Sequence, residues 1–260
     1  MYTLQSPYLV DKPLGATPLQ ALDVFRRVRN IPGTVKLAYA GRLDPLASGL
    51  LAVLSGEQLA HQEDYWYLPK QYEAHIVCGV TTDSFDVMGM PVSQGHQEHT
   101  AERITAVLRG LVGKIDLSVP VYSSQRFQGE ALFSLARNQP DKTIIVPVRR
   151  MVISQIDAHR SERITTDALA ALACERIGLV QGDFRQQEIC EAWKALFVQR
   201  EELISFHLTI HCGSGTYIRS IAQEIGRRLG NGAVLAGLRR TAIGAWRVTD
   251  SDVTKLSWPQ

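Results

Sequence analysis

The segment ISFHLTIHC, residues 204–212, constrains the fold of this chain more than any other stretch, because apolar and polar side chains alternate along it. Side chains of a β-strand point alternately to the two faces of a sheet, so the segment is predicted to be a strand with one apolar face. After the turn-like GSGTY, apolar residues recur at helical spacing over 218–229, and Gly230 stands where a helix can end in left-handed conformation. Both elements must bury their apolar faces against other parts of the chain.

Strands and helices follow one another without strict alternation in the rest of the chain. The predicted elements are helices at 18–28 and 104–111, two helices within 165–200, and strands at 71–80, 151–157 and 241–249. The second helix within 165–200 begins near Asp183 and includes Phe197. This order favours an α+β fold, with a central mixed, largely antiparallel sheet and flanking helices, over a doubly wound fold. We expect a single domain over 1–260 with a helical insertion at 158–200.

The composition is that of a globular protein, with 260 residues of which 45% are hydrophobic and 21% charged. The chain has no run of about 18 apolar residues. Its first residues do not form a basic stretch followed by an apolar core, as a secretion signal would. We therefore expect no membrane span and no secretion signal, and a monomeric protein of the cytoplasm.

The cysteines and histidines do not form a recognisable metal or redox motif. The cysteines are far apart and form no C-x-x-C pair: Cys78, Cys174, Cys190 and Cys212. We predict single buried thiols in a reducing compartment. His96 and His99 are close together, but their polar surroundings, SQGHQEHT, are typical of a solvated loop rather than a metal site.

The net charge of +2 conceals an uneven distribution along the chain. Residues 1–56 carry a net charge of +3, residues 57–212 carry −5, and residues 213–247 carry +5. If the two basic segments converge in the fold, they form a surface suited to phosphate groups. If they do not, they are ordinary solvated faces, and the charge pattern leaves both alternatives open.

Asp44 lies in the stretch AYAGRLDPLASGLLAV, where a lone carboxylate precedes an almost purely apolar run. Aspartate before proline is common in turns, so a turn former is the first interpretation of this segment taken alone. If Asp44 is instead functional, it needs a cation to keep it ionised in apolar surroundings. Arg42 and Arg219 are the candidates, and Arg219 stands where the glycine-rich turn passes into the predicted helix.

Other catalytic patterns find little support in this chain. The motifs G-x-x-x-x-G-K-[ST], H-E-x-x-H and G-x-S-x-G are absent, which speaks against a nucleotide-dependent enzyme and against several classes of hydrolase. A glycosidase normally places two carboxylates across the scissile bond, and no second carboxylate pairs obviously with Asp44 in the sequence.

Five blocks, taken together and in this order, resemble the TruB family of tRNA pseudouridine synthases. They are DKPLGATP (11–18), YAGRLDPLASGLL (39–51), KQYEAHIVCG with TTDSFD (70–86), PVYSSQRFQG (120–129) and GSGTYIRSIAQEIGRRLGNGAVLAGLRRT (213–241). The resemblance implies the pseudouridine synthase fold and the isomerisation of a uridine at position 55, in the T-loop of tRNA. It also implies that the base is flipped into a pocket and that no cofactor or metal takes part.

The resemblance further implies roles for individual residues. Asp44 matches the catalytic aspartate and nucleophile, Tyr72 the tyrosine that stacks on the target base, and Arg219 the arginine that pairs with the aspartate. These three are expected to meet in one cleft. Six residues stand at positions expected to contact the substrate: Tyr39, Arg42, Asp86, Arg126, Tyr217 and Leu238. Lys12 belongs to a block that supports the active-site loop.

Several features depart from the usual pattern of the family. Tyr39 replaces a histidine, Arg42 a small or hydroxyl residue, and Arg126 a lysine. The motif GRLD (41–44) resembles the corresponding motif of the RsuA and RluA types of synthase, which modify ribosomal RNA as well as tRNA. Because the chain ends soon after the last predicted strand, we expect no C-terminal RNA-binding domain. Two alternatives therefore stay open: a synthase acting on ribosomal or another RNA, and a non-catalytic RNA-binding or RNA-folding protein of the same fold.

Overall fold

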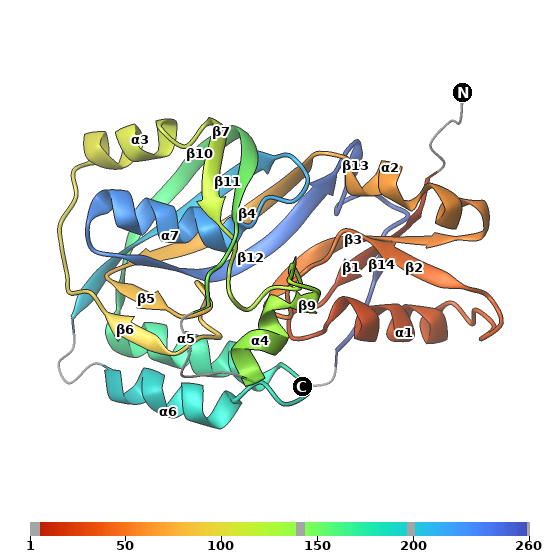
Figure 1. Cartoon of the computed structure of the whole chain (residues 1–260), viewed down its shortest axis with the longest axis horizontal. Coiled ribbons are helices and arrows are strands. Elements are labelled where there is room, and N and C mark those ends of the chain that lie inside the picture. Colours follow the sequence, from red (N-terminus) through yellow and green to blue (C-terminus); the bar gives the residue numbers. More distant parts are fainter. Residues whose placement is uncertain (1–5, 139–143, 197–200, 259–260) are drawn as a thin grey trace.

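A computed structural model describes residues 6–138, 144–196 and 201–258 of the chain. Its centre is a ten-stranded sheet with the order β14-β1-β3-β12-β4-β11-β10-β7, in which β2 pairs with β3 and β13 with β12 (Figure 1). The strands are β1 (Tyr8–Lys12), β2 (Leu37–Ala40), β3 (Ala47–Ser55), β4 (Lys70–Cys78), β7 (Gly113–Ser118), β10 (Val148–Thr165), β11 (Glu202–Cys212), β12 (Ala233–Ile243), β13 (Trp246–Arg247) and β14 (Thr254–Lys255).

The pairing of β12 with β3 and of β1 with β14 is parallel, and the other pairs of this sheet are antiparallel. The sheet is therefore mixed and largely antiparallel, and the predicted α+β class is confirmed. Two small sheets join β5 (Val80–Thr82) to β6 (Pro91–Ser93) and β8 (Arg126–Phe127) to β9 (Glu130–Ala131).

Helices cover both faces of the sheet (Figure 1). They are α1 (Pro18–Val28), the 3-10 helix η1 (Gly56–His61), α2 (Gln62–Trp66), α3 (Ala101–Arg109), α4 (Leu132–Asn138), α5 (Thr166–Gly178), α6 (Gln186–Leu196) and α7 (Ile218–Leu229). One buried cluster lies between the central strands and α7 with α3, and a second lies between the opposite face and α5 with α6. Burial on both faces is what holds the central strands in the interior.

The clearest predictions from the sequence are confirmed. β11 and α7 occupy 202–212 and 218–229, and Gly230 ends α7 with a left-handed φ of 101°. Thr17 caps α1 by accepting a hydrogen bond from the backbone N–H of Gln20. These elements rely on local periodicity and on capping side chains, which a single sequence displays directly.

The predicted last strand at 241–249 is wrong in its bounds, because β12 begins at Ala233 and ends at Ile243. Val234 and Ala236 face the cluster beneath α5 and α6, whereas Leu235 faces the cluster beneath α7. Since both faces of this part of β12 are buried, no polar residues alternate along it and the period that marks a half-buried strand is missing.

The expected helical insertion at 158–200 differs from the structure at its start. β10 continues to Thr165 and pairs with β11 over this stretch, so residues 158–165 belong to the sheet. The helical part begins with α5, and α6 begins at Gln186 rather than near Asp183. Phe197, which was assigned to the second helix, lies outside the described residues.

The cysteine prediction is correct for two residues and wrong for two. Cys78 and Cys212 are free and buried, whereas Cys174 of α5 and Cys190 of α6 form a disulfide. The two are 16 positions apart and have no motif spacing. The packing of α5 against α6 brings them together, and sequence spacing does not reveal that contact.

Within the described residues, no helix is long and apolar enough to cross a membrane.

Candidate active site

Asp44 lies on the loop between β2 and β3, and two buried basic side chains, those of Lys12 and Arg240, donate hydrogen bonds to carbonyl oxygens of this loop. Lys12 is fully buried, and its Nζ donates hydrogen bonds to the carbonyl oxygens of Ala16 at 2.5 Å and Pro13 at 2.9 Å, with that of Pro45 at 3.5 Å. The guanidinium of Arg240 donates to the carbonyl oxygens of Leu50, Arg42 and Gly41. Of these carbonyl groups, those of Pro45, Arg42 and Gly41 belong to the irregular loop with Asp44, so the bonds help to hold the backbone of that loop.

Arg219, on the first turn of α7, points across the site toward Asp44. Its Nη2 donates to Asp44 Oδ1 at 3.1 Å, and its Nε lies 2.8 Å from Asp44 Oδ2. The Nε–H does not align with that oxygen, so the second contact is an ion pair without a hydrogen bond. The Arg219 side chain is 4% exposed and that of Asp44 41% exposed, so a buried cation holds a carboxylate that opens to solvent.

A second carboxylate, that of Asp86, shares the same guanidinium at 3.7 Å. Asp86 Oδ1 accepts hydrogen bonds from the Ser84 hydroxyl at 2.6 Å and from the backbone N–H of Met88 at 3.0 Å. Arg219 also donates to the carbonyl oxygens of Ser84 and Tyr122. The guanidinium therefore ties together the Asp44 loop, the segment with Asp86 and the loop before β8, three segments far apart in the sequence.

In this network, burial and the neighbouring opposite charges shift the pKa of each group in opposite directions. Burial disfavours the charged form of Arg219, but Asp44 and Asp86 outweigh it and raise the pKa of the guanidinium. Burial raises the pKa of Asp86, and Arg219 counteracts the rise. Burial lowers the pKa of Lys12 to about 7, although Asp44 favours its charged form. Arg219 thus favours the ionised form of Asp86, but burial outweighs this effect and the pKa of Asp86 is raised.

Tyr72, on β4, is buried in the same cluster as Leu43 and Ala47, which flank Asp44 in the chain. Burial raises the pKa of its phenol, the Arg240 guanidinium opposes the rise, and the Asp44 carboxylate adds to it. The phenol and the carboxylate thus interact electrostatically, and the phenol stays protonated at neutral pH.

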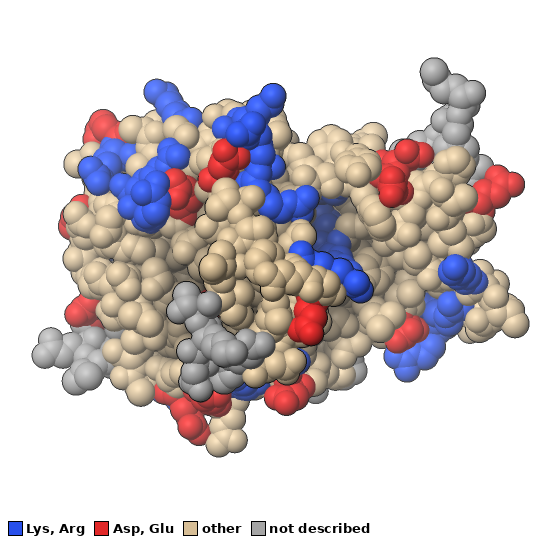
Figure 2. Space-filling view, in the orientation of Figure 1, with Lys and Arg blue, Asp and Glu red and all other residues tan. Residues whose placement is uncertain are grey.

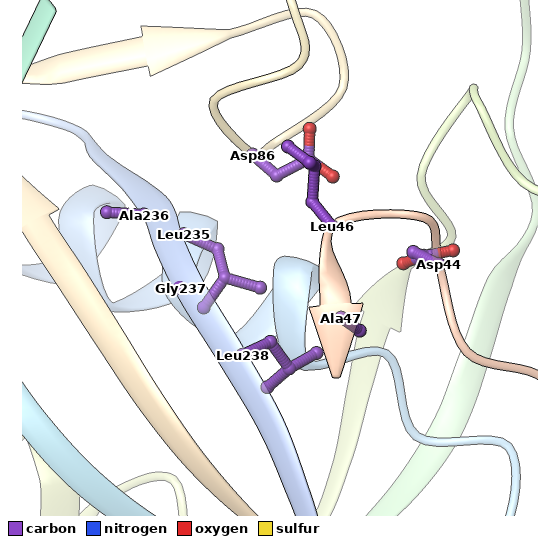
Figure 3. Close-up of a pocket in the computed structure, with 8 residues that line it drawn as sticks. All are labelled: Asp44, Leu46, Ala47, Asp86, Leu235, Ala236, Gly237 and Leu238. Carbon is purple, nitrogen blue, oxygen red and sulfur yellow. The ribbon is translucent and has the colours of Figure 1, made fainter. Parts of the chain in front are cut away.

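A narrow pocket opens beside Asp44 (Figure 3). Asp44, Leu46 and Ala47 line it from the start of β3 and the loop before it, Asp86 from a second loop, and residues 235–238 from β12. Its cavity volume is about 10 Å³, room for about one water molecule. Two carboxylates thus stand at the edge of an otherwise apolar recess.

The structure brings only some of the expected substrate contacts to this pocket. Asp86 and Leu238 line it, whereas Tyr217 lies just before α7 and packs against the core next to Arg219. Tyr39 packs beneath α1, in a different cluster from Tyr72. Arg42 and Arg126 are exposed and do not line the pocket. Any role of Tyr39, Arg42 or Arg126 in binding must therefore involve parts of a substrate that lie outside the pocket.

Several residues of this site were not anticipated from the sequence. Leu46 and Leu235 line the pocket, and the Tyr122 carbonyl holds Arg219. Tyr122 stands in the block PVYSSQRFQG, from which only Arg126 was selected. A backbone carbonyl carries no side-chain signal, so only the folded geometry identifies it.

Among the described residues, one group offers three potential metal ligands within 4.8 Å of one another: His75, Glu162 and His207. The two imidazole rings stack at 4.4 Å between centroids, and His207 Nε2 lies 2.8 Å from Glu162 Oε1. Glu162 also pairs with Arg160. None of the three residues lines the pocket beside Asp44, so this group is separate from the candidate active site.

The two basic segments do converge in the sheet, since Arg239 and Arg240 of β12 pair with Ser48 and Gly49 of β3. Yet Arg219 and Arg240 are buried, and Arg239 pairs with Asp11 at 2.7 Å. Much of this charge therefore supports the fold. Lys and Arg side chains gather around a hollow between the part of the molecule with α4 and α7 and the part with α1 and β2 (Figure 2).

The sequence of this chain is similar to those of known proteins. A sequence model described as TruB family pseudouridylate synthase (N terminal domain) matches residues 29–177. "tRNA pseudouridine synthase B" of Methylobacillus flagellatus is 33% identical over 89% of this chain and 62% of its own length. The protein of the same name from Azoarcus sp. is 33% identical over 91% and 64%, and that from Protochlamydia amoebophila 31% identical over 94% and 76%.

The fold agrees with solved structures as well. The chain resembles one in "Crystal Structure of a Cbf5-Nop10-Gar1 Complex", with a TM-score of 0.57 and 18% identity over 95% of this chain and 52% of that chain. At this identity the likeness shows the fold alone. This chain spans 62% and 64% of the first two relatives named above. The family match and the similarity to the Protochlamydia protein together show that this chain belongs to the TruB family of pseudouridylate synthases.

Proposed function

We propose that this protein converts a uridine of tRNA, at position 55 in the T-loop, to pseudouridine. The observation that carries the proposal is the ion pair in which the buried Arg219 guanidinium holds the Asp44 carboxylate at the edge of a pocket. Membership in the TruB family supports the type of reaction. The relatives named tRNA pseudouridine synthase B support tRNA as the substrate.

The proposed reaction is an isomerisation in which atoms balance without a co-reactant. The N1–C1′ bond of the uridine breaks, the uracil turns, a C5–C1′ bond forms, C5 loses its proton and N1 gains one. Asp44 begins the reaction by attack at C1′, by attack at C6 or by supporting loss of the 2′ proton, and these three paths stay open. In the first path C5 later displaces Asp44 from C1′, in the second the bond between Asp44 and C6 breaks by elimination, and in the third the 2′ carbon regains a proton when the C5–C1′ bond forms. Each of them needs a carboxylate held in a fixed position, and the contacts of Arg219 with Asp44 support this.

Binding of the base requires the pocket to widen. A cavity of about 10 Å³ cannot hold a uracil, so Leu46, Leu235 or Leu238 must move aside when the nucleotide is flipped in. Flipping costs a few kcal/mol of unstacking. Tyr72 is buried and does not line the closed pocket, so its ring is proposed to provide a flat surface for the base once the pocket has widened.

Exposed arginines outside the pocket are proposed to hold the phosphates of the RNA. Arg42, Arg126 and Arg149 are exposed, and Arg149 is positioned by a hydrogen bond of 2.9 Å to Gln125. Phosphate contacts release counterions, so binding should weaken steeply as the salt concentration rises. We also propose a monomeric enzyme that acts in the cytoplasm, where its tRNA substrate is found.

The test replaces Asp44 by asparagine, which keeps the shape of the side chain and removes its charge. Asp44→Asn should fold normally and form no pseudouridine in a T-arm transcript, a loss of several orders of magnitude in rate. Pseudouridine is mapped in the transcript after incubation. Asp23→Asn is the matched control, because Asp23 is an exposed carboxylate on α1.

Incubation of the wild-type protein with total RNA separates this proposal from the alternatives. Pseudouridine at position 55 of tRNA supports it, and modification of ribosomal RNA alone points to a different substrate. Tight binding of the T-arm without product would favour a non-catalytic RNA-binding protein. Turnover retained in Asp44→Asn would refute the assignment of Asp44.

A further inference from the structure

The helices α5 and α6 do not line the pocket themselves, but they pack against residues that line or adjoin it. Three residues of the segments that surround the pocket pack in the buried cluster of these helices: Leu46, Val87 and Ala236. The Ala236 carbonyl also accepts a hydrogen bond from Arg176 of α5. The position of the pocket walls therefore depends on α5 and α6 as well as on the sheet.

The segment with Asp86 depends most on this support, because its backbone is irregular. Phe85 has a left-handed φ of 67°, a conformation that an aromatic L-residue rarely adopts. The Phe85 carbonyl accepts a hydrogen bond from Leu235 at 3.0 Å, and the Val87 N–H donates to the Leu235 carbonyl at 3.2 Å. β12 therefore holds one side of this segment.

Trp193 holds the other side. This residue of α6 is fully buried, and its indole Nε1–H donates to the Val87 carbonyl at 3.0 Å. Val87 directly follows Asp86, and the Asp86 carboxylate in turn accepts from the N–H of Met88 and lies 3.7 Å from Arg219. A displacement of the Val87 peptide would thus move the carboxylate that shares Arg219 with Asp44.

We propose that Trp193 is a positioning residue of this site, whose hydrogen bond to Val87 keeps Asp86 against Arg219 and thereby keeps Asp44 in place. The inference rests on the proposed function for its effect on catalysis. Its structural part, the fixing of residues 84–88 by α6, is independent of any activity.

The experiment compares two tryptophans that make the same kind of bond. Trp193→Phe removes the bond to Val87, and Trp258→Phe removes a bond of 3.2 Å from the Trp258 indole to the Leu179 carbonyl. Leu179 does not line the pocket, so the second variant is the matched control. Because phenylalanine also leaves a cavity, a third protein carries 3-benzothienylalanine at position 193, which exchanges the indole N–H for sulfur at nearly constant shape.

Amide hydrogen exchange and the kinetics of pseudouridine formation are measured on the wild type and on these three variants. Both changes at Trp193 should accelerate exchange of the Val87 and Met88 amides and lower kcat by about tenfold to a hundredfold with KM nearly unchanged, as expected for misplaced catalytic groups. In an Asp86→Asn background the effect of Trp193→Phe on kcat should shrink to nearly none, since Trp193 acts through Asp86. Trp258→Phe should change neither quantity.

The outcomes separate this inference from the proposed function. An active wild-type enzyme whose kcat survives both changes at Trp193, or whose losses multiply with that of Asp86→Asn, would refute the inference. Unchanged exchange at Val87 and Met88 would refute it in the same way. A wild-type protein that modifies no RNA, but in which exchange responds as expected, would overturn the proposed function and support the structural role of Trp193.

Discussion

The guanidinium of Arg219 is close to both carboxylates of the site. Arg219 is 3% exposed and faces both Asp44 and Asp86. Arg219→Met would leave two carboxylates close together without their shared cation, and the loss of one partner of a buried pair costs about 3–5 kcal/mol. Since Asp44 is partly solvated, we expect a loss near the lower end of that range. Urea denaturation measures the free energy of unfolding.

The matched control at this scale is Arg227→Met. Arg227 pairs with Glu224 at 2.6 Å but is exposed, and such surface pairs contribute about 0–1 kcal/mol. If the two variants lost equal stability, the Arg219 network would be no more than a surface ion pair. The distances at the site would then not reflect a strong interaction.

At the scale of elements, the contact between β3 and β12 depends on a glycine. Gly49 has a φ of 102°, and a Cβ there would lie 2.2 Å from the Arg240 carbonyl oxygen. Gly49→Ala should therefore lower the free energy of unfolding by more than about 2 kcal/mol, because both strain and overlap with backbone oppose it. Gly33→Ala is the control, since a Cβ at Gly33 meets nothing within 4 Å. Equal thermal melting of the two variants would contradict the close approach of β3 and β12.

At the scale of the whole molecule, buried lysines make stability depend on pH. Burial lowers the pKa of Lys12 to about 7 and that of Lys70 to about 8, from an ordinary value of 10.5. Above these values the folded protein releases protons that the unfolded chain still binds, so the free energy of unfolding should rise with pH. Urea denaturation at about pH 7 and pH 8 measures the rise, because below about pH 8 the thiols of Cys78 and Cys212 stay largely protonated in the unfolded chain as well as in the folded protein.

Lys12→Met tests the origin of this dependence. The variant will be less stable at every pH because it loses bonds to carbonyl oxygens, but its stability should change less between the two pH values. An unchanged slope would mean that Lys12 does not titrate in this range. Only the slope, and not the stability itself, decides this prediction.

An element of this molecule can be predicted from the sequence where its residues show the period of a strand or of a helix. The apolar side chains of β11 and α7 meet in one buried cluster, and polar residues alternate with them along both elements, so their sequences display the period of a strand and of a helix. β12 is buried on both faces and has no such period, and its bounds were wrong. The irregular loops of the site hold Asp44 and Asp86 through bonds to backbone carbonyls, which leave no pattern in the sequence.

The chain taken alone predicts the class of the fold and its most regular elements, and its resemblance to a family points to Asp44, Tyr72 and Arg219 as candidate residues. Three contacts become visible only in the folded molecule: Arg219 with Asp44 across 175 positions, Cys174 with Cys190, and Trp193 with the loop that contains Asp86. The difference lies in the range of the interactions. Periodicity and capping act between neighbours in the chain, whereas these contacts form only when the sheet sets the register of distant strands and the helices pack on its faces.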